Sequence, residues 1–406
     1  MRFQVTFFSD GTAYWNDGHE LRFDHGTGHG AWEKVGGNGF ESTFLWAAFD
    51  KTSASGAGNI FKLRFSGRVN GDDLTNAKLN LTIFPPGTDP LDPGDVGGVP
   101  VFGTFNVENA RRVKLDPPQN DISGDPTGEY VLGAWWGKAL PADPSTAPFP
   151  EVVMMLNFMP DHNIVATDVF ELAAPHTTAH GGPWARTSDG TVHCIFLWTN
   201  MTKETDYNGY AKVRITGKID PNDLDFMTGT VRPTGFAPGA DVLDPSDPFS
   251  GFFGQFNIVE LTRIKADPTI ATTVGQDYSA NLSSGVWYGK AVANDPSSPM
   301  QEIVIMPHFL PNGNVVWNDS QEQSLPHGTG FGNWAPSATG GNGVKAVGIL
   351  QKFDVSQANS FGGVYKLKFN GRVCKKDCVN GHSVRYSVIG RRENGRRKRS
   401  ASGVAG

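Results

Sequence analysis

The chain repeats itself with a period of 151 residues, and the repeated feature is a short polar motif. The motif reads Asp, two residues, Glu, four residues, His, and it begins at Asp17, Asp168 and Asp319. A period of this length indicates tandem domains rather than the short stacked units of a solenoid protein. The 406-residue chain is also long enough for several domains of about 100 to 200 residues, each with its own core. We therefore expect three copies of one module.

The repeat also predicts where the modules begin and end. We place two modules and a partial third, followed by a basic disordered tail, at residues 1–150, 151–301, 302–390 and 391–406. The first two copies share a segment at residues 103–107 and 254–258 that has no counterpart after the third copy. The third module is therefore expected to be incomplete.

Charge divides unevenly between the tail and the rest of the chain. Residues 391–399 have a net charge of +5, so with −6 for the whole chain the remainder carries −11. An acidic body lacks the clustered cations that bind nucleic acid. No apolar run reaches the roughly 18 residues of a membrane span, and the N-terminal segment lacks the pattern of a signal peptide. We expect a cytoplasmic protein whose folded body contacts neither nucleic acid nor membrane.

Alternating apolar and polar residues predict strands in every copy. At residues 61–66, 211–216 and 365–370 every second side chain is apolar and the intervening ones are mostly cationic. This pattern is typical of an antiparallel strand with one solvated face. Turn sequences rich in Pro, Asp, Asn and Gly join neighbouring strands into hairpins. About seven or eight strands per module suit a closed up-and-down barrel or a sandwich.

Two segments resemble the signature of a known barrel family and favour the barrel. Residues 133–135 and 285–287 read Gly-Ala-Trp and Gly-Val-Trp, which is similar to the Gly-x-Trp signature of lipocalin-like proteins, where the indole closes one end of the barrel. The resemblance covers two of the three copies. It implies an all-β chain of tandem antiparallel up-and-down barrels that enclose small apolar or amphipathic ligands. In this chain, however, the segment falls at the end of a predicted module.

The repeated motif supplies the candidate site residues. A second histidine, His29 or His180, follows four positions after the first in copies one and two, and Phe331 replaces it in copy three. Glycines and threonines around the histidines favour a loop at the barrel mouth. The predicted catalytic residues are Asp17, His25, Asp168, His176, Asp319 and His327. The predicted ligand-binding residues are Glu20, His29, Trp32, Glu171, His180, Trp184, Glu322 and Trp334.

Three interpretations of this cluster remain open. The acids and histidines can satisfy backbone groups of the loop, hold zinc or iron, or form an Asp-His pair that moves protons. A metal site would be lost in the third copy, because Phe331 cannot bind a metal, whereas the Asp-His pair is present in all three. We assign no metal or cofactor from the sequence.

The predicted function is the binding of a small apolar or amphipathic ligand in barrel cavities bordered by the Asp/Glu/His cluster. One alternative is an isomerase, cyclase or lyase whose Asp-His pair shuttles a proton on a ligand in the same cavity. The other is a structural protein whose barrels are filled by side chains and whose repetition serves multivalent contacts. An open cavity faced by the histidines would favour the first two over the third.

Overall fold

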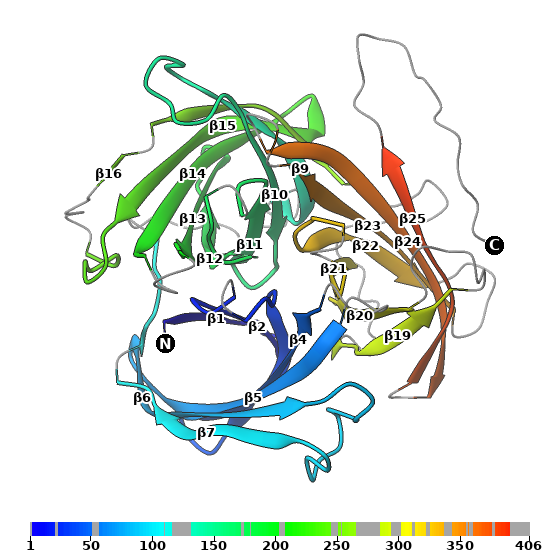
Figure 1. Cartoon of the computed structure of the whole chain (residues 1–406). Helices are drawn as coiled ribbons and strands as arrows, with labels where there is room; N and C mark the ends of the chain where they lie inside the picture. The colour runs from blue at the N-terminus through cyan, green and yellow to red at the C-terminus, as the bar shows by residue number, and fades with distance from the viewer. Residues whose placement is uncertain are drawn as a thin grey trace.

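The fold consists of antiparallel strands arranged as three curved sheets around a common centre (Figure 1). The computed structural model describes residues 2–20, 23–50, 57–108, 110–115, 131–171, 174–178, 180–202, 208–244, 251–252, 254–264, 285–293, 302–310, 313–321, 325–336, 343–354, 356, 360–375 and 378–389. Among these residues we find no helix with the length and apolar character that crossing a lipid bilayer requires. The all-β class predicted from the sequence is confirmed. We call the three sheets, each with its loops, the first, second and third modules.

The second sheet closes into a complete barrel. Its strands are β9 (Gly133–Pro141), β10 (Val152–Phe158), β11 (Asn163–Asp168), β12 (His180–Arg186), β13 (Thr191–Thr199), β14 (Tyr210–Asp220), β15 (Asp223–Phe236), β16 (Gly251–Phe252) and β17 (Phe256–Arg263). Neighbours pair in chain order from β9 to β15, and β17 lies between β15 and β9, which closes the ring. The short β16 pairs with β15. Such an eight-stranded ring leaves an interior that side chains or one small ligand can fill.

The first and third sheets are half-barrels. The first contains β1 (Phe3–Phe7), β2 (Thr12–Asp17), β3 (Gly28–Val35), β4 (Gly39–Phe49), β5 (Ala57–Asn70), β6 (Asp73–Phe84), β7 (Val99–Asn106) and β8 (Ala110–Arg111). The third contains β18 (Gly285–Val286), β19 (Gly289–Val292), β20 (Glu302–Phe309), β21 (Asn314–Asp319), β22 (Gly330–Pro336), β23 (Gly343–Phe353), β24 (Phe361–Lys375) and β25 (Cys378–Ile389). Within the described ranges, no hydrogen-bonded pairing joins the two ends of either sheet.

The sheets defined by backbone hydrogen bonds begin and end at other residues than the module boundaries predicted from the repeat. Strand β9 falls within the predicted first module, yet it pairs with β10 and β17 of the second sheet. Strands β18 and β19 fall within the predicted second module, yet both pair with β20 of the third sheet. A period fixes the spacing of equivalent residues but not the residue at which a unit begins. The predicted tail at residues 391–406 lies outside the described residues.

The Gly-x-Trp strand β9 contributes to the core of the second barrel. Trp135 is 0% exposed, and its Nε1 donates a hydrogen bond to the carbonyl oxygen of Val131 at 2.9 Å. The guanidinium of Arg263, on β17, lies 4.4 Å from the centroid of the Trp135 ring. Arg263 Nε also donates to Asp225 Oδ1 at 3.0 Å. These contacts join the first and last strands of the barrel.

The strands that lead to the repeated motif are buried on both faces. Every position of β2 and β21 is buried, and so are the five positions of β11 after the first. A sheet with one solvated face would instead expose alternate residues. One face of each strand fills its own barrel, and the other faces the centre of the molecule. Apolar side chains from all three modules meet there, among them Tyr14, Met155, Val165, Val316 and Phe331.

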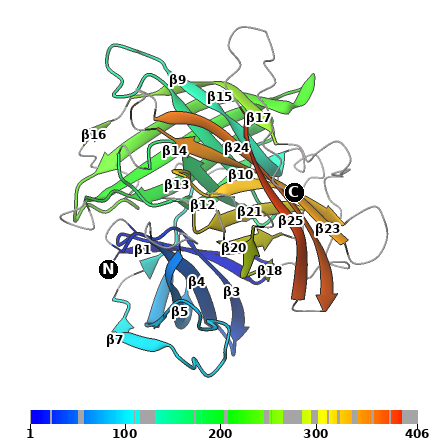
Figure 2. The ribbon, with the colours of Figure 1, turned by 45° about the vertical axis from the view of Figure 1, so that its right-hand side comes forward.

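The three modules contact one another head to tail. Strand β1 contacts β12, β9 and β10 contact β22, and β18 contacts β3; Figure 2 shows β1 directly below β12. Equivalent side chains repeat this pattern. Asn16 Nδ2 of the first module donates to the carbonyl of Thr178 in the second, and Asn318 Nδ2 of the third donates to that of Thr27 in the first at 3.0 Å. The chain therefore forms a closed ring with approximate three-fold symmetry.

Candidate functional site

Each module holds a buried Asp-His pair. The aspartates end β2, β11 and β21. Each histidine lies in the following loop, where its backbone forms an antiparallel bridge to Ala48 in β4, to Asn200 just after β13, or to Lys352 in β23. The distances from histidine Nε2 to the carboxylate oxygen are 3.7 Å for His25 and Asp17, 3.5 Å for His176 and Asp168, and 3.5 Å for His327 and Asp319. The structure thus brings these six predicted residues together as three pairs.

The backbone determines which ring nitrogen faces the acid. Nδ1 of His25, His176 and His327 lies 2.8, 3.0 and 2.9 Å from the carbonyl oxygen of the next residue. Nδ1 therefore carries the hydrogen in the neutral ring and donates it to that carbonyl. Nε2 of a neutral ring would then present a lone pair to the carboxylate. This arrangement is favourable only when a positive charge, either a proton or a cation, lies between the two.

Electrostatics at the second pair keeps the acid ionised and one imidazole neutral. Burial would raise the pKa of Asp168, but His176, His180 and the Phe170 amide outweigh it and leave that pKa below its usual range. Burial also lowers the pKa of His180 to about 3. Near neutral pH the pocket therefore contains one carboxylate and at least one neutral imidazole.

The second module differs from the others at the position two residues before the aspartate. In the first and third modules this residue is Trp15 or Trp317, which lies in the core of its own sheet. Each indole Nε1 donates to Oδ2 of the aspartate, at 2.9 Å in the first module and 3.1 Å in the third. The second module has Ala166 instead. There Nε2 of His180 lies 3.9 Å from Oδ2 of Asp168.

One extra residue turns His180 toward the interior of its barrel. Three equivalent glycines, Gly30, Gly182 and Gly332, identify the shift, because a Cβ at each would clash with a carbonyl oxygen of the neighbouring strand. His29 and Phe331 come directly before this glycine, whereas His180 comes two residues before it. Side chains alternate between the faces of a strand, so a shift of one residue changes the face.

The strand register shows what this shift produces. Trp15 pairs with Gly28 and Trp317 pairs with Gly330, whereas Ala166 pairs with His180. A tryptophan beside a glycine in two modules is thus replaced by an alanine beside a histidine in the second.

His29 lies on the other face of its strand, toward the centre of the molecule. Its ring centroid lies 4.8 Å from that of Tyr14, and Phe331 of the third module is in the shared central core. The structure does not bring His29 to the pair of Asp17 and His25. The equal spacing of His29 and His180 in the sequence conceals the extra residue, so the two histidines are not structurally equivalent.

The remaining predicted residues lie elsewhere. Trp32, Trp184 and Trp334 donate through Nε1 to the carbonyls of Phe8, Met159 and Leu310, at 2.7, 2.9 and 2.8 Å. These contacts anchor the preceding hairpin turns, and none of the three indoles lines the cavity described below. Glu322 lies outside the described residues.

Glu20 and Glu171 lie where modules meet. Glu20 Oε2 accepts hydrogen bonds from the amide and hydroxyl of Thr178 in the second module, at 2.8 and 3.2 Å. Glu171 accepts one from the Thr167 hydroxyl, and its other oxygen lies close to Gly328 of the third module. Burial raises the pKa of Glu20 to about 8 and that of Glu171 well above its usual value. Both acids therefore contribute to the contacts between modules.

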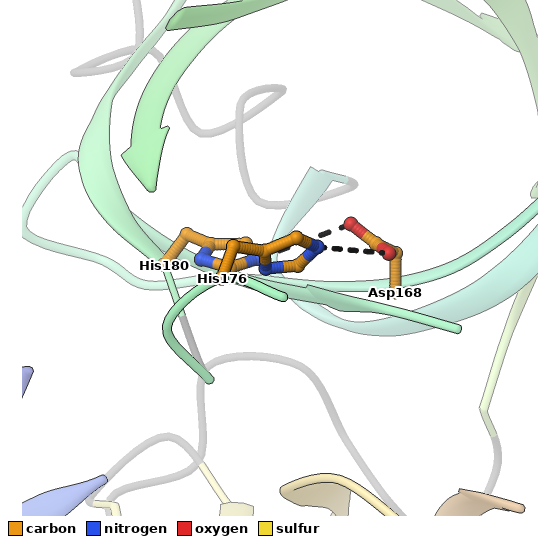
Figure 3. Close-up of side chains that lie close together, drawn as sticks. All are labelled: Asp168, His176 and His180. Atoms are coloured by element: carbon orange, nitrogen blue, oxygen red, sulfur yellow. Dashed lines mark ion pairs between the residues drawn. The ribbon is translucent and has the colours of Figure 1, made fainter. Parts of the chain in front are cut away.

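A cavity lies inside the second barrel beside Asp168. The space open to the centre of a water molecule is about 90 Å³, well above the roughly 10 to 15 Å³ that one water needs. Its walls are mostly apolar, with Met154, Phe170, Phe196, Trp198 and Phe256 among them. The polar part of the lining includes Asp168 and the two histidines, whose rings point toward the carboxylate (Figure 3).

Ala166 was not among the residues that sequence reasoning singled out, although a signal for it exists. The three strands that precede the motif end in Trp-Asn-Asp, Ala-Thr-Asp and Trp-Asn-Asp. A small residue where two copies carry tryptophan marks the copy with free interior volume.

Comparisons of the chain with protein-family models, with curated proteins and with solved structures find no match. The site itself is therefore the basis for a functional proposal.

Proposed function

We propose that the protein binds a small, mostly apolar ligand with one polar group in the cavity of the second barrel. The observation that carries this proposal is Ala166, which leaves open the volume that Trp15 and Trp317 occupy in the other modules. Burial of an apolar ligand against such walls contributes about 25 cal/mol per Å² of surface removed from water. The polar group of the ligand binds at Asp168 and its two histidines.

The proposal assigns one ligand site to the chain rather than three. In the first and third modules, Oδ2 of the aspartate already accepts a hydrogen bond from the indole of Trp15 or Trp317. These two modules then serve as the rigid surroundings of the second. The position of Trp135 in the first strand of the closed barrel supports the likeness to lipocalin-like barrels, which bind ligands in their interiors.

Exchanging the interior pair of the second module for that of its neighbours is expected to abolish ligand binding. In Ala166→Trp/His180→Gly the indole fills the cavity and can donate to Asp168. We expect the affinity for the neutral fluorescent probe N-phenyl-1-naphthylamine to fall by at least about tenfold, measured by fluorescence titration. The unfolding temperature should stay equal or rise, because filled cavities stabilise proteins.

The matched control is Ala166→Ser, which keeps a small side chain at the same position and should retain the probe affinity. Unchanged affinity in the double variant would contradict the proposal. So would a wild-type protein that neither binds the probe nor releases a small molecule on organic extraction and mass spectrometry.

A further inference from the structure

We propose that Asp168, His176 and His180 together bind one divalent transition-metal ion, with coordination positions left open toward the cavity. One ligand atom from each residue lies within 4.8 Å of the other two, and all three residues are buried. Figure 3 shows both imidazoles on the same side of the Asp168 carboxylate, facing its oxygens. Two histidines and one carboxylate are the ligand set of zinc and non-haem iron sites that keep an open position. The inference goes beyond ligand binding and does not depend on it.

Unpartnered ring nitrogens are the second observation for this site. Nε2 of His176 and both ring nitrogens of His180 have no hydrogen-bond partner among the described residues, although these side chains are 2% and 0% exposed. Buried polar atoms in proteins are nearly always hydrogen-bonded. A metal ion bound to both Nε2 atoms would give a partner to these two of the three nitrogens.

A backbone carbonyl orients His176 as metal sites require, and aromatic rings pack against both imidazoles. The hydrogen bond from His176 Nδ1 to the Thr177 carbonyl, at 3.0 Å, leaves Nε2 free to donate its lone pair. The ring of His176 stacks on Trp198 with centroids 4.7 Å apart, and that of His180 stacks on Phe196 at 5.7 Å. Both rings are therefore held in place before any ion binds.

The distances match the size of a small divalent ion. Ligand bonds of about 2.0 to 2.1 Å in tetrahedral geometry place neighbouring ligand atoms about 3.3 Å apart. The Nε2 atoms of His176 and His180 lie 3.5 and 3.9 Å from the two oxygens of Asp168. The three side chains would close around the ion from separations of at most 4.8 Å between their ligand atoms. The ion would also supply the positive charge that the facing lone pair and carboxylate need.

The other modules lack a third ligand. Oδ2 of Asp17 and of Asp319 already accepts an indole hydrogen bond. Glycines, Gly28 and Gly330, occupy the strand position at which the second module has His180. Among the described residues, only the second module therefore has this three-ligand cluster. The expected stoichiometry is one ion per chain, whereas the histidine spacing in the sequence would predict two.

The full chain is first treated with a chelator, and binding of Zn²⁺ alone is then measured by calorimetric titration. Metal analysis after dialysis gives the number of bound ions. We expect one Zn²⁺ per chain, and a loss of affinity of at least about tenfold in His180→Gln and in Asp168→Asn. Two controls should keep the wild-type affinity: His29→Gln, at the same spacing in the first module, and His193→Gln on β13 of the same barrel. Circular dichroism verifies that each variant is folded.

X-ray absorption of the Zn²⁺-loaded wild type gives a readout that needs no variant, and it should show two imidazole ligands. No saturable binding, two ions per chain, fewer than two imidazoles, or unchanged affinity in folded His180→Gln would overturn the inference. Binding of N-phenyl-1-naphthylamine is measured in the same samples with and without Zn²⁺. Metal without probe binding would refute only the ligand proposal, and probe without metal binding only the metal site.

Discussion

Raising the pH from about 5 to about 9 is expected to remove the contribution of Glu20 to the free energy of unfolding, which is at most about 5 kcal/mol. Burial raises the pKa of Glu20 from 4.5 to about 8. Between these values the unfolded chain has lost the proton that the folded protein still holds. The stabilisation is therefore complete below pH 4.5 and is lost as the pH rises through about 8.

Urea unfolding of the wild type and Glu20→Gln at several pH values measures this contribution. The glutamine is neutral throughout, so the variant should lose less stability than the wild type over the same range. Glu33→Gln is the control, because Glu33 is exposed on β3 of the same module, and it should follow the wild type. Parallel pH profiles for the wild type and Glu20→Gln would show that the Glu20 carboxyl does not titrate as its burial requires.

Replacing Trp135 with alanine is expected to destabilise the second barrel by about 3 to 5 kcal/mol. The substitution removes a fully buried ring, its hydrogen bond to Val131, and the surface on which Arg263 stacks. Chemical denaturation would measure the loss. Trp287→Ala is the matched control in the third module, where the indole is only partly buried and its Nε1 has no hydrogen-bond partner among the described residues.

Trp287→Ala should lower the free energy of unfolding clearly less than Trp135→Ala does. Equal losses for the two variants would show that the position in the Gly-x-Trp segment, rather than closure of the barrel, determines the contribution of the indole.

The fold class could be predicted because alternation over a few residues indicates strands. The repetition could be predicted because the same short motif recurs at a constant spacing. Alternation at residues 61–66 and 211–216 lies within β5 and β14 of the structure, and the 151-residue period gives three equivalent sheets. The limits of the sheets were not predictable from the period. The limits depend on which strand pairs with β10 and which with β20. The period of the repeat does not indicate these pairings.

The Asp-His pairs were also predictable, because their residues lie close together in the sequence and end equivalent strands. The direction of His29 and His180 was not, since it depends on one extra residue and on pairing with the neighbouring strand. The contact of Glu20 with the second module could not be predicted for another reason. Its partner, Thr178, is 158 residues away and comes near only when the ring of modules closes.

Joining the three units in one polypeptide frees each from the sequence of the others. In an assembly of identical subunits, every substitution appears at all three positions, so a change that opens one interior would open them all. Here Thr167 stands where the other copies have Asn16 and Asn318, and Ala166 stands where they have tryptophan. One copy can thus open its interior while the other two retain filled interiors and the packing around it.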